Sequence, residues 1–255
     1  MKKKIAIFTG AGISAESGIS TFRDIKDGLW YNYKVDDVAT VEGWRKNRST
    51  VLEFHNMLRS KLPTVEPNDA HRALALLEEE YDVTVITQNV DDLHERGGST
   101  NIIHLHGELT KARGCMYDNK PSPLDEVIDI GYNEIKMGDK CQTTGSQLRP
   151  HIVWFGEYPF GVQEAYKAVE EADILLVIGT SLQISYTLDM LNQVSREGDE
   201  LYGGKEACDI YYIDPSPMQY LTNYGLKVNY IRKSATEGVT ELVQTLITKA
   251  KEENV

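Results

Sequence analysis

Cysteine is scarce in this chain, where only Cys115, Cys141 and Cys208 occur among 255 residues. A disulfide-stabilised scaffold would need more, so this count favours a reducing compartment. Long apolar runs are also missing, because the longest, at 5–8 and 174–178, are far shorter than the ~20 residues that span a bilayer. The lysines at 2–4 lead straight into an apolar run without the features of a secretory signal. We therefore expect a cytoplasmic protein with no membrane partner.

Positive charge is in deficit as well, with 27 basic against 39 acidic residues and a formal net charge of −12. A surface this negative repels phosphate backbones and anionic lipids, which argues against nucleic acid as a partner. Hydrophobic residues at 41% and charged residues at 26% are ordinary for a globular chain and exclude a disordered or collagen-like one. At this length we expect one large domain with small modules.

Short apolar runs bounded by turn residues recur along the chain. Six of them are predicted to be strands, at residues 4–9, 83–88, 102–106, 151–155, 174–178 and 210–214. They are apolar on both faces, which is typical of a parallel sheet covered by helices on each side. Helical spacing lies between them at 70–80, 160–171 and 239–247, with Asn68 and Thr236 as possible N-caps. The sequence therefore predicts a doubly wound α/β fold.

Two stretches interrupt this rhythm. Residues 24–67 predict a loop and a small helical module, and the polar, turn-rich residues 109–150 predict an inserted small module. The core of a single domain, 1–255, would then comprise about residues 1–23, 68–108 and 151–255.

A glycine-rich turn, Gly10-Ala11-Gly12-Ile13-Ser14, follows the first predicted strand. A strand, such a turn and a helix start let backbone N–H groups meet a pyrophosphate, and Gly10 and Gly12 would allow the close approach. The third glycine of the dinucleotide fingerprint is missing, so an ordinary glycine turn is an equal alternative.

Amide and carboxylate groups cluster just past the second predicted strand, at Gln88, Asn89 and Asp91. Open α/β sheets bind ligands at that edge, and this trio could hold a carboxamide or ribose hydroxyls. The alternative is a helix N-cap, in which Asn89 or Asp91 satisfies free N–H groups.

Two histidines, His104 and His106, occupy alternate positions of the third predicted strand, ahead of Gly107. A histidine at the end of a strand beside a ligand site is a natural general base, because its unperturbed pKa is near neutrality. For His104 we favour a capped or core-packed imidazole, and the same alternative stays open for His106.

Together these motifs resemble the sirtuin family of NAD-dependent protein deacylases, and its bacterial members most closely. The segments GTS at 179–181 and RPHIVWFGE at 149–157 also stand in sirtuin order, and the resemblance covers residues 3–247. It implies a Rossmann-like sheet with a small helical module and an insert at the position of a zinc ribbon. It also implies NAD as cofactor and acyl-lysine proteins or peptides as substrates.

The resemblance further implies which residues bind NAD. They are Gly10, Ala11, Gly12, Ile13, Ser14, Phe22, Arg23, Trp30, Gln88, Asn89, Asp91, Gly179, Thr180, Ser181, Asp214 and Ala235. Asn89 and Asp91 would hold the nicotinamide end and act with His106, the general base on the ribose hydroxyls. The acyl-lysine oxygen would attack the ribose carbon as nicotinamide leaves, so that the products are lysine, nicotinamide and O-acyl-ADP-ribose.

The segment Val153-Trp154-Phe155-Gly156-Glu157 resembles the strand that pairs with the substrate peptide. The alternative is an ordinary apolar strand with Trp154 and Phe155 in the core, and one face can serve each purpose.

Desuccinylating relatives carry Tyr-x-x-Arg in the helical module, whereas His55 and Leu58 occupy those positions here. Arg59 comes one residue late and would point elsewhere on a helix. A buried carboxylate without its bidentate partner is costly, so a neutral acyl group is favoured. We expect His55 to line the substrate site, the alternative being a surface residue.

The zinc-ribbon position is degenerate. Sirtuins usually carry two CxxC pairs there, but Cys115 and Cys141 are each left without the second cysteine, since Asp118 and Thr144 follow three residues later. Tetrahedral structural zinc prefers four cysteine or histidine ligands, so we expect no metal site.

Two other functions remain open. Protein ADP-ribosyl transfer or NAD hydrolysis would use the same nucleotide site, but the retained VWFGE segment and His106 favour deacylation. A non-catalytic NAD-binding module would predict a lost general base, whereas His106 and Asp91 are both present.

Overall fold

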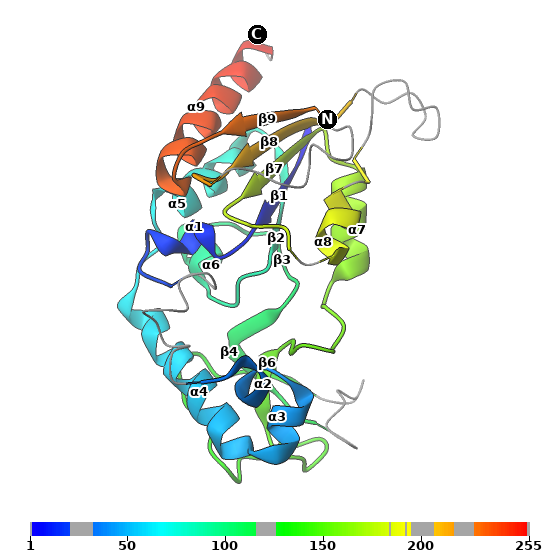
Figure 1. Cartoon of the computed structure of the whole chain (residues 1–255). Coiled ribbons are helices and arrows are strands. Elements are labelled where there is room, and N and C mark those ends of the chain that lie inside the picture. Colours follow the sequence, from blue (N-terminus) through cyan, green and yellow to red (C-terminus); the bar gives the residue numbers. More distant parts are fainter. Residues whose placement is uncertain are drawn as a thin grey trace.

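A six-stranded parallel sheet, in the order β3-β2-β1-β7-β8-β9, forms the centre of the computed structural model (Figure 1). The residues described are 2–20, 33–115, 126–183, 185–191, 193–194, 207–216 and 227–253. The strands are β1 (Lys4–Thr9), β2 (Asp82–Thr87), β3 (Ile102–His104), β7 (Ile174–Ile178), β8 (Asp209–Ile213) and β9 (Val228–Ile231). From β1 the chain adds β2 and β3 on one side, and then β7, β8 and β9 on the other side. The strand order therefore reverses between β1 and β7, and Rossmann-like sheets bind ligands at such a point.

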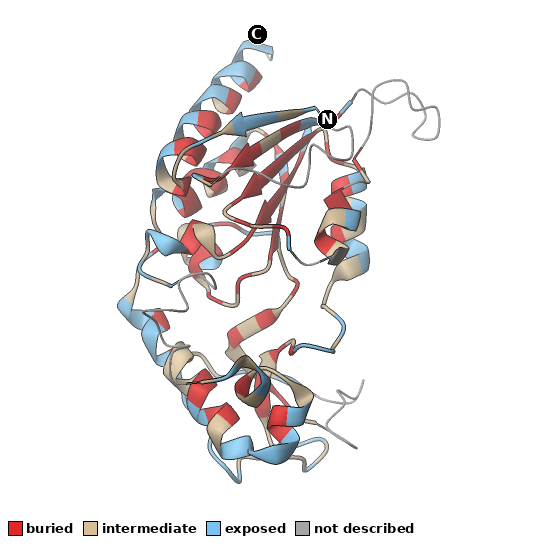
Figure 2. Ribbon diagram, in the orientation of Figure 1, coloured by how far each residue is buried: buried red, intermediate tan, exposed pale blue. Residues whose placement is uncertain are grey.

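Helices cover both faces of this sheet (Figure 1). They are α5 (Asp69–Leu76), α7 (Val162–Glu170), α8 (Ser185–Leu191) and α9 (Ala235–Glu253). Ile5 and Ile7 of β1 pack into a cluster with α5 and α9, whereas Ala6 and Phe8 pack into another with α7 and α8. The inner strands are therefore buried on both sides, as the red strands of Figure 2 show, whereas the edge strands β3 and β9 are not; the predicted doubly wound α/β fold is confirmed.

A smaller module lies at the bottom of Figure 1. It contains α2 (Val35–Val38), α3 (Val41–Lys46), α4 (Arg48–Lys61), β4 (Gly107–Arg113), β5 (Val127–Asp129) and β6 (Arg149–Ile152). The strands form an antiparallel sheet in the order β5-β4-β6. Trp44 of α3, Leu109 of β4 and Trp154 belong to one buried cluster, so the helices and the small sheet share a core.

The prediction that residues 151–155 form a strand of the parallel sheet is wrong. β6 ends at Ile152 and pairs antiparallel with β4 in the small sheet. Apolar composition alone does not distinguish the partners of a strand, which depend on the whole chain path. β9 was not predicted, because as an edge strand it exposes Asn229 and Tyr230 and lacks the two-sided apolar pattern.

Of the two predicted caps, the structure bears out one. Asn68 accepts hydrogen bonds from the N–H groups of Ala70 and His71 at the start of α5. The Thr236 cap is wrong, because α9 begins at Ala235 and the Glu16 carboxylate accepts from the Thr236 N–H instead. The remaining short helices are α1 (Gly12–Ala15), α6 (Leu93–Gly97), η2 (Leu62–Thr64) and η3 (Leu77–Glu79). No helix within the described residues combines the length and hydrophobicity that a membrane crossing needs.

Candidate active site

The turns that follow β1 and β7 touch one another at the reversal point of the sheet. The Gly10 N–H donates to Ile178 O (3.0 Å) and the Gly12 N–H to Gly179 O (2.8 Å). A Cβ on Gly12 would lie only 2.6 Å from Gly179 Cα, and Gly179 itself is at φ 59°. The glycines are therefore required for contact between the two turns, a function that the sequence did not reveal.

Ser14, at the end of the glycine-rich turn after β1, connects that turn to the turn after β2. The Asn89 side-chain amide donates to Ser14 Oγ, which in turn donates to Asp91 Oδ2, both at 3.0 Å. All three side chains are buried. Two motifs that are 75 residues apart in sequence thus form one hydrogen-bonded row.

Asp91 is the acid of this row, and its pKa is shifted. Burial raises the pKa of Asp91 to about 6, although hydrogen bonds from the Leu93 N–H and the Ser14 hydroxyl favour its ionised form. Asp91 thereby satisfies the free N–H of Leu93, the first residue of α6, but the N-cap residue of this helix is Asp92, so the N-cap alternative holds only in part. One Asp91 oxygen therefore serves the helix while the other belongs to the row with Ser14.

His106 and Gln88 lie beside this row. The Nδ1 atom of His106 is 2.9 Å from Gln88 O, and the Thr180 hydroxyl donates to Gln88 Oε1 at 2.9 Å. A carbonyl oxygen only accepts, so Nδ1 carries the ring proton and Nε2 keeps its lone pair. Burial lowers the pKa of His106, which leaves the imidazole neutral at pH 7. The chain thus supplies a neutral base of fixed tautomer at the end of the sheet.

His104 has different partners. Its Nε2 lies 2.6 Å from Glu95 Oε1, and its Nδ1 lies 3.4 Å from Asn89 O. Burial lowers the pKa of His104, but the hydrogen bond and charge of Glu95 outweigh it, so the pKa is raised overall. His104 is held by its neighbours, in agreement with the interpretation favoured from the sequence.

The other residues expected to bind nucleotide lie along the same edge where they are described. Asp214 follows β8 and accepts from the Ser216 N–H at 2.7 Å, and Ala235 begins α9; both are buried. Ser181 follows Thr180 in the turn after β7 and is half-buried. Three further predicted residues, Phe22, Arg23 and Trp30, lie outside the described residues.

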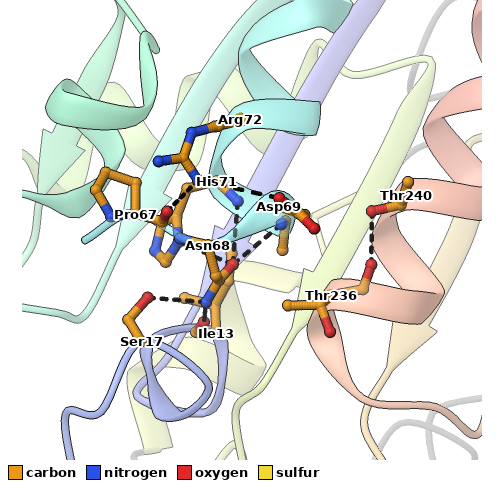
Figure 3. Close-up of polar contacts among 10 residues, drawn as sticks. Ile13, Ser17, Pro67, Asn68, Asp69, His71, Arg72, Thr236 and Thr240 are labelled. Atoms are coloured by element: carbon orange, nitrogen blue, oxygen red, sulfur yellow. Dashed lines mark hydrogen bonds and ion pairs between the residues drawn. The ribbon is translucent and has the colours of Figure 1, made fainter. Parts of the chain in front are cut away.

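Asn68 is a positioning residue that the sequence suggested only as a helix cap. Besides capping α5, its amide donates to Ile13 O (2.7 Å) and to Ser17 Oγ (3.0 Å), as Figure 3 shows. Because Ile13 belongs to the glycine-rich turn, one side chain fixes that turn against α5.

The segment expected to pair with a substrate peptide, Val153 to Glu157, leaves the small sheet after β6. The Val153 N–H donates to His106 O (2.9 Å) and the Phe155 N–H to Ala39 O (3.0 Å). Trp154 is buried, whereas Phe155 is 57% exposed. The alternative that places both aromatic rings in the core is therefore wrong for Phe155.

A buried ion pair holds the end of this segment. Arg149 donates to both carboxylate oxygens of Glu157, at 2.7 and 2.9 Å, and its guanidinium lies over the Trp154 ring at 3.3 Å. Burial raises the pKa of Glu157, but Arg149 more than offsets this, so the pKa lies below its ordinary value. The ion pair thus holds the end of the segment in place, and Gly156 within the segment is exposed.

His55 is buried at 3% exposure, which excludes the surface alternative. Its Nδ1 lies 2.8 Å from Val51 O, and Trp154 Nε1 donates to its Nε2 at 3.4 Å. Burial lowers the pKa of His55 to about 4, so it is a neutral residue that supports Trp154. Arg59 does point elsewhere, toward Leu109 O and Asn56 Oδ1.

The described residues do not form a cysteine-based metal site. Their one cluster of three or more close acidic, histidine or cysteine ligand atoms comprises Glu95, His104 and Glu108, and contains neither Cys115 nor Cys141. Cys141 is buried, and its backbone closes a turn with Gly145 and Ser146. Residues 116–125, which include Asp118, lie outside the described residues. The thiols present thus do not fit a four-ligand zinc site.

The chain is similar to known proteins over most of its length. The model of the Sir2 family matches residues 10–186. An NAD-dependent protein deacylase of Bacteroides thetaiotaomicron is 46% identical over 245 residues, which cover 96% of this chain and 98% of that protein. Another, of Helicobacter pylori, is 43% identical over 248 residues, with coverage of 97% and 99%. A crystal structure of a Sir2 homolog–NAD complex is 34% identical with a TM-score of 0.79, covering 98% of this chain and 91% of that one.

Proposed function

The chain belongs to the Sir2 family, and from that premise we propose that it removes acyl groups from protein lysine side chains at the expense of NAD. The products are nicotinamide, the free lysine and an O-acyl-ADP-ribose. Relatives at 43–46% identity over nearly the whole chain are NAD-dependent protein deacylases, which supports this function. Cytoplasmic location and the exclusion of nucleic acid and membrane surfaces as partners remain part of the proposal.

The polar edge of the sheet suits a dinucleotide. Buried polar side chains follow β1, β2, β7 and β8, with Ser14, Asn89, Thr180 and Asp214 as examples, and their hydroxyl, amide and carboxylate groups are of the kinds that bind ribose hydroxyls and a carboxamide. When bound, NAD supplies a ribose carbon from which nicotinamide can leave. Asn89 and Asp91 would hold the nicotinamide end, Ile13 would shield it, and Gly10 to Ser14 and Gly179 to Ser181 would line the ribose and phosphates.

The single observation that carries the assignment is the state of His106. Its Nδ1 proton is committed to Gln88 O, so its Nε2 is an unprotonated base next to the row of Ser14, Asn89 and Asp91. His106 would take the proton from a ribose hydroxyl, which turns that oxygen into a nucleophile. A non-catalytic NAD-binding protein has no need of such a base.

Substrate peptides would bind along Val153 to Glu157, beside His106. Main-chain pairing explains how one site accepts many protein sequences. His55 lies behind this segment and acts on the substrate side through Trp154. Neutral acyl groups are favoured, because His55 and Leu58 replace the pair that holds a carboxylate and Arg59 is engaged elsewhere.

The function is tested by incubating the protein with NAD and an acetyl-lysine peptide and identifying the products by mass. O-acetyl-ADP-ribose from the wild type and none from His106→Ala is the expected result. Modified protein or free ADP-ribose would support ADP-ribosyl transfer or NAD hydrolysis instead, and intact NAD would reject an enzyme of either kind. A succinyl-lysine peptide tests the preferred acyl group. If kcat/KM for it exceeds that for the acetyl-lysine peptide tenfold or more, which corresponds to about 1.4 kcal/mol in transition-state binding, the preference for neutral acyl groups is rejected.

A further inference from the structure

His106 has a second polar neighbour that the proposed reaction does not use. The phenol oxygen of Tyr186, on α8, lies 2.6 Å from His106 Nε2, and the two rings meet edge to face with centroids 6.3 Å apart. Since the Nδ1 proton is directed at Gln88 O, the neutral ring has its one lone pair at Nε2. The Tyr186 hydroxyl therefore donates a hydrogen bond to that lone pair.

The ionisation states of both groups agree with this bond. Burial raises the pKa of Tyr186 to about 12, and burial lowers the pKa of His106. At neutral pH the phenol keeps its proton and the imidazole has none at Nε2. This is the pairing of donor and acceptor that the 2.6 Å contact requires.

A ribose hydroxyl needs the same lone pair. A general base must accept a hydrogen bond from the group that it deprotonates, and an imidazole nitrogen has one in-plane lone pair for that purpose. Tyr186 already uses the Nε2 lone pair of His106. The phenol and the ribose hydroxyl are thus mutually exclusive partners of this nitrogen.

We propose that Tyr186 is a positioning residue that masks the base nitrogen of His106 in the nucleotide-free protein and releases it when NAD binds. The inference rests on the proposed function, because it takes His106 as the base. While the site is free of nucleotide, the phenol keeps the imidazole in the orientation that it needs. Binding of NAD then breaks this hydrogen bond, which weakens the affinity for the nucleotide and keeps the base inactive without it.

The backbone that leads to α8 carries strain that a rearrangement could relieve. Leu182 has φ 52°, in the left-handed region that residues other than glycine rarely adopt. Its side chain is buried in the cluster against which Tyr186 packs. Strain of this kind persists only where surrounding contacts impose it, and it is concentrated in segments that change conformation.

The test is Tyr186→Phe, which keeps the ring and removes only the hydroxyl. ADP-ribose, which carries the ribose hydroxyls but cannot react, should bind about two- to tenfold more tightly to this variant by calorimetry, the range expected for one hydrogen bond. The KM for NAD should fall with it. The acid limb of the pH profile of kcat/KM for NAD should also move to higher pH, because a bond that stabilises neutral His106 is lost.

Tyr166→Phe is the matched control, since Tyr166 lies on α7 and packs against the same cluster. It should leave the affinity for ADP-ribose and the pH profile unchanged. Unchanged or weaker binding of ADP-ribose by Tyr186→Phe overturns the proposal. Tyr186→Leu, which also lacks the hydroxyl, must show the same direction of change, so that a folding defect in one variant does not decide the matter.

Failure of the proposed function gives a different result. It would appear as a wild-type protein that releases no nicotinamide with NAD and acetyl-lysine peptide. A wild-type protein that deacylates, combined with unaltered ADP-ribose binding by Tyr186→Phe, would reject only the role of the tyrosine.

Discussion

Asp91 shows how much the burial of one side chain changes what it can do. In water the pKa of its carboxyl group would be about 4. In the protein only 7% of the residue is exposed, and this burial raises the pKa to about 6. The hydrogen bonds from the Ser14 hydroxyl and the Leu93 N–H compensate for only part of that cost. An ionised acid that is this costly to the fold is typical of residues retained for function.

The pKa of Asp91 predicts a pH-dependent gain in stability from Asp91→Asn. The folded state holds the Asp91 proton more tightly than the unfolded chain, so the wild type loses stability as pH rises from about 4 to about 6. Asparagine has no charge to bury and should raise the free energy of unfolding at pH 7.5 by about 1–3 kcal/mol. At pH 4 the gain should vanish, because the aspartate is then largely protonated in the folded state and little of the penalty remains.

Urea denaturation at the two pH values measures this difference. The same variant should lose deacylation, since the carboxylate is proposed to hold the nicotinamide end of NAD. Lower stability at pH 7.5 than the wild type would contradict the account of Asp91.

At the scale of elements, the turns between strands and helices do the positioning. The turn after β1 touches the turn after β7 through glycines, and Asn68 ties it to α5. These contacts join three segments that are distant in sequence. They also explain why the first turn needs glycine without matching the dinucleotide fingerprint.

Gly179→Ala should destabilise the protein strongly. Its Cβ would lie 2.5 Å from Ile13 N in addition to the unfavourable φ of 59°. Gly131 is the matched control, because it has φ 53° and a Cβ added there would meet nothing within 4 Å. We expect Gly131→Ala to cost about 1–2 kcal/mol from the backbone alone, and Gly179→Ala about 2–5 kcal/mol because overpacking adds to it.

Chemical denaturation compares the two alanine variants, and binding of ADP-ribose should weaken only in Gly179→Ala. Equal losses of stability would mean that the two turns can separate without cost, contrary to the contacts described.

Asn68→Ala tests whether a helix cap also positions the nucleotide site. It removes the cap of α5 and the bonds to Ile13 O and Ser17 Oγ, and should cost about 1–2 kcal/mol of stability. Asn47, whose side chain accepts from the Thr50 N–H at the start of α4, provides a control cap far from the glycine-rich turn. Asn47→Ala should cost about 1 kcal/mol.

Steady-state kinetics distinguish the two caps. The KM for NAD should rise about three- to tenfold for Asn68→Ala, as for the loss of a hydrogen bond, and stay unchanged for Asn47→Ala. A rise of similar size in both variants would reduce Asn68 to a purely structural residue.

At the scale of the whole molecule, the large sheet supplies the edge at which we propose that NAD binds, and the small module supplies the segment from Val153 to Glu157. Trp44 and Trp154, 5.5 Å apart between ring centroids, and the pair of Arg149 and Glu157 hold the module together in its described part. None of these contacts involves Cys115 or Cys141. We therefore propose that the chain binds no structural zinc.

Metal analysis of protein purified without chelator tests this proposal. We expect substoichiometric zinc and a melting temperature that EDTA does not change, whereas a structural zinc would contribute on the order of 10 kcal/mol. The double variant Asp118→Cys with Thr144→Cys restores both CxxC pairs and should gain zinc as a positive control. Stoichiometric zinc in the wild type would contradict the proposal.

The sequence by itself determined the fold class and the segments that carry chemistry. Runs such as 4–9 and 174–178 are apolar on both faces. A strand of a parallel sheet is covered on both sides and needs such residues, so the pattern can be recognised without the structure. Polar and glycine residues directly after those runs must lie at one edge of a parallel sheet, so Gly10, Asn89 and Thr180 could be predicted to lie there.

Tertiary structure alone decided which of these groups touch. Residues 149–152 joined the small sheet because strand pairing is a long-range choice, and His55 became buried support because Trp154 packs over it. No local pattern connects Tyr186 with His106, which are 80 residues apart and meet through helix packing against the sheet. Hydrogen bonds and pKa values at the site depend on such distant neighbours, and for that reason the sequence predicted its residues but not the contacts among them.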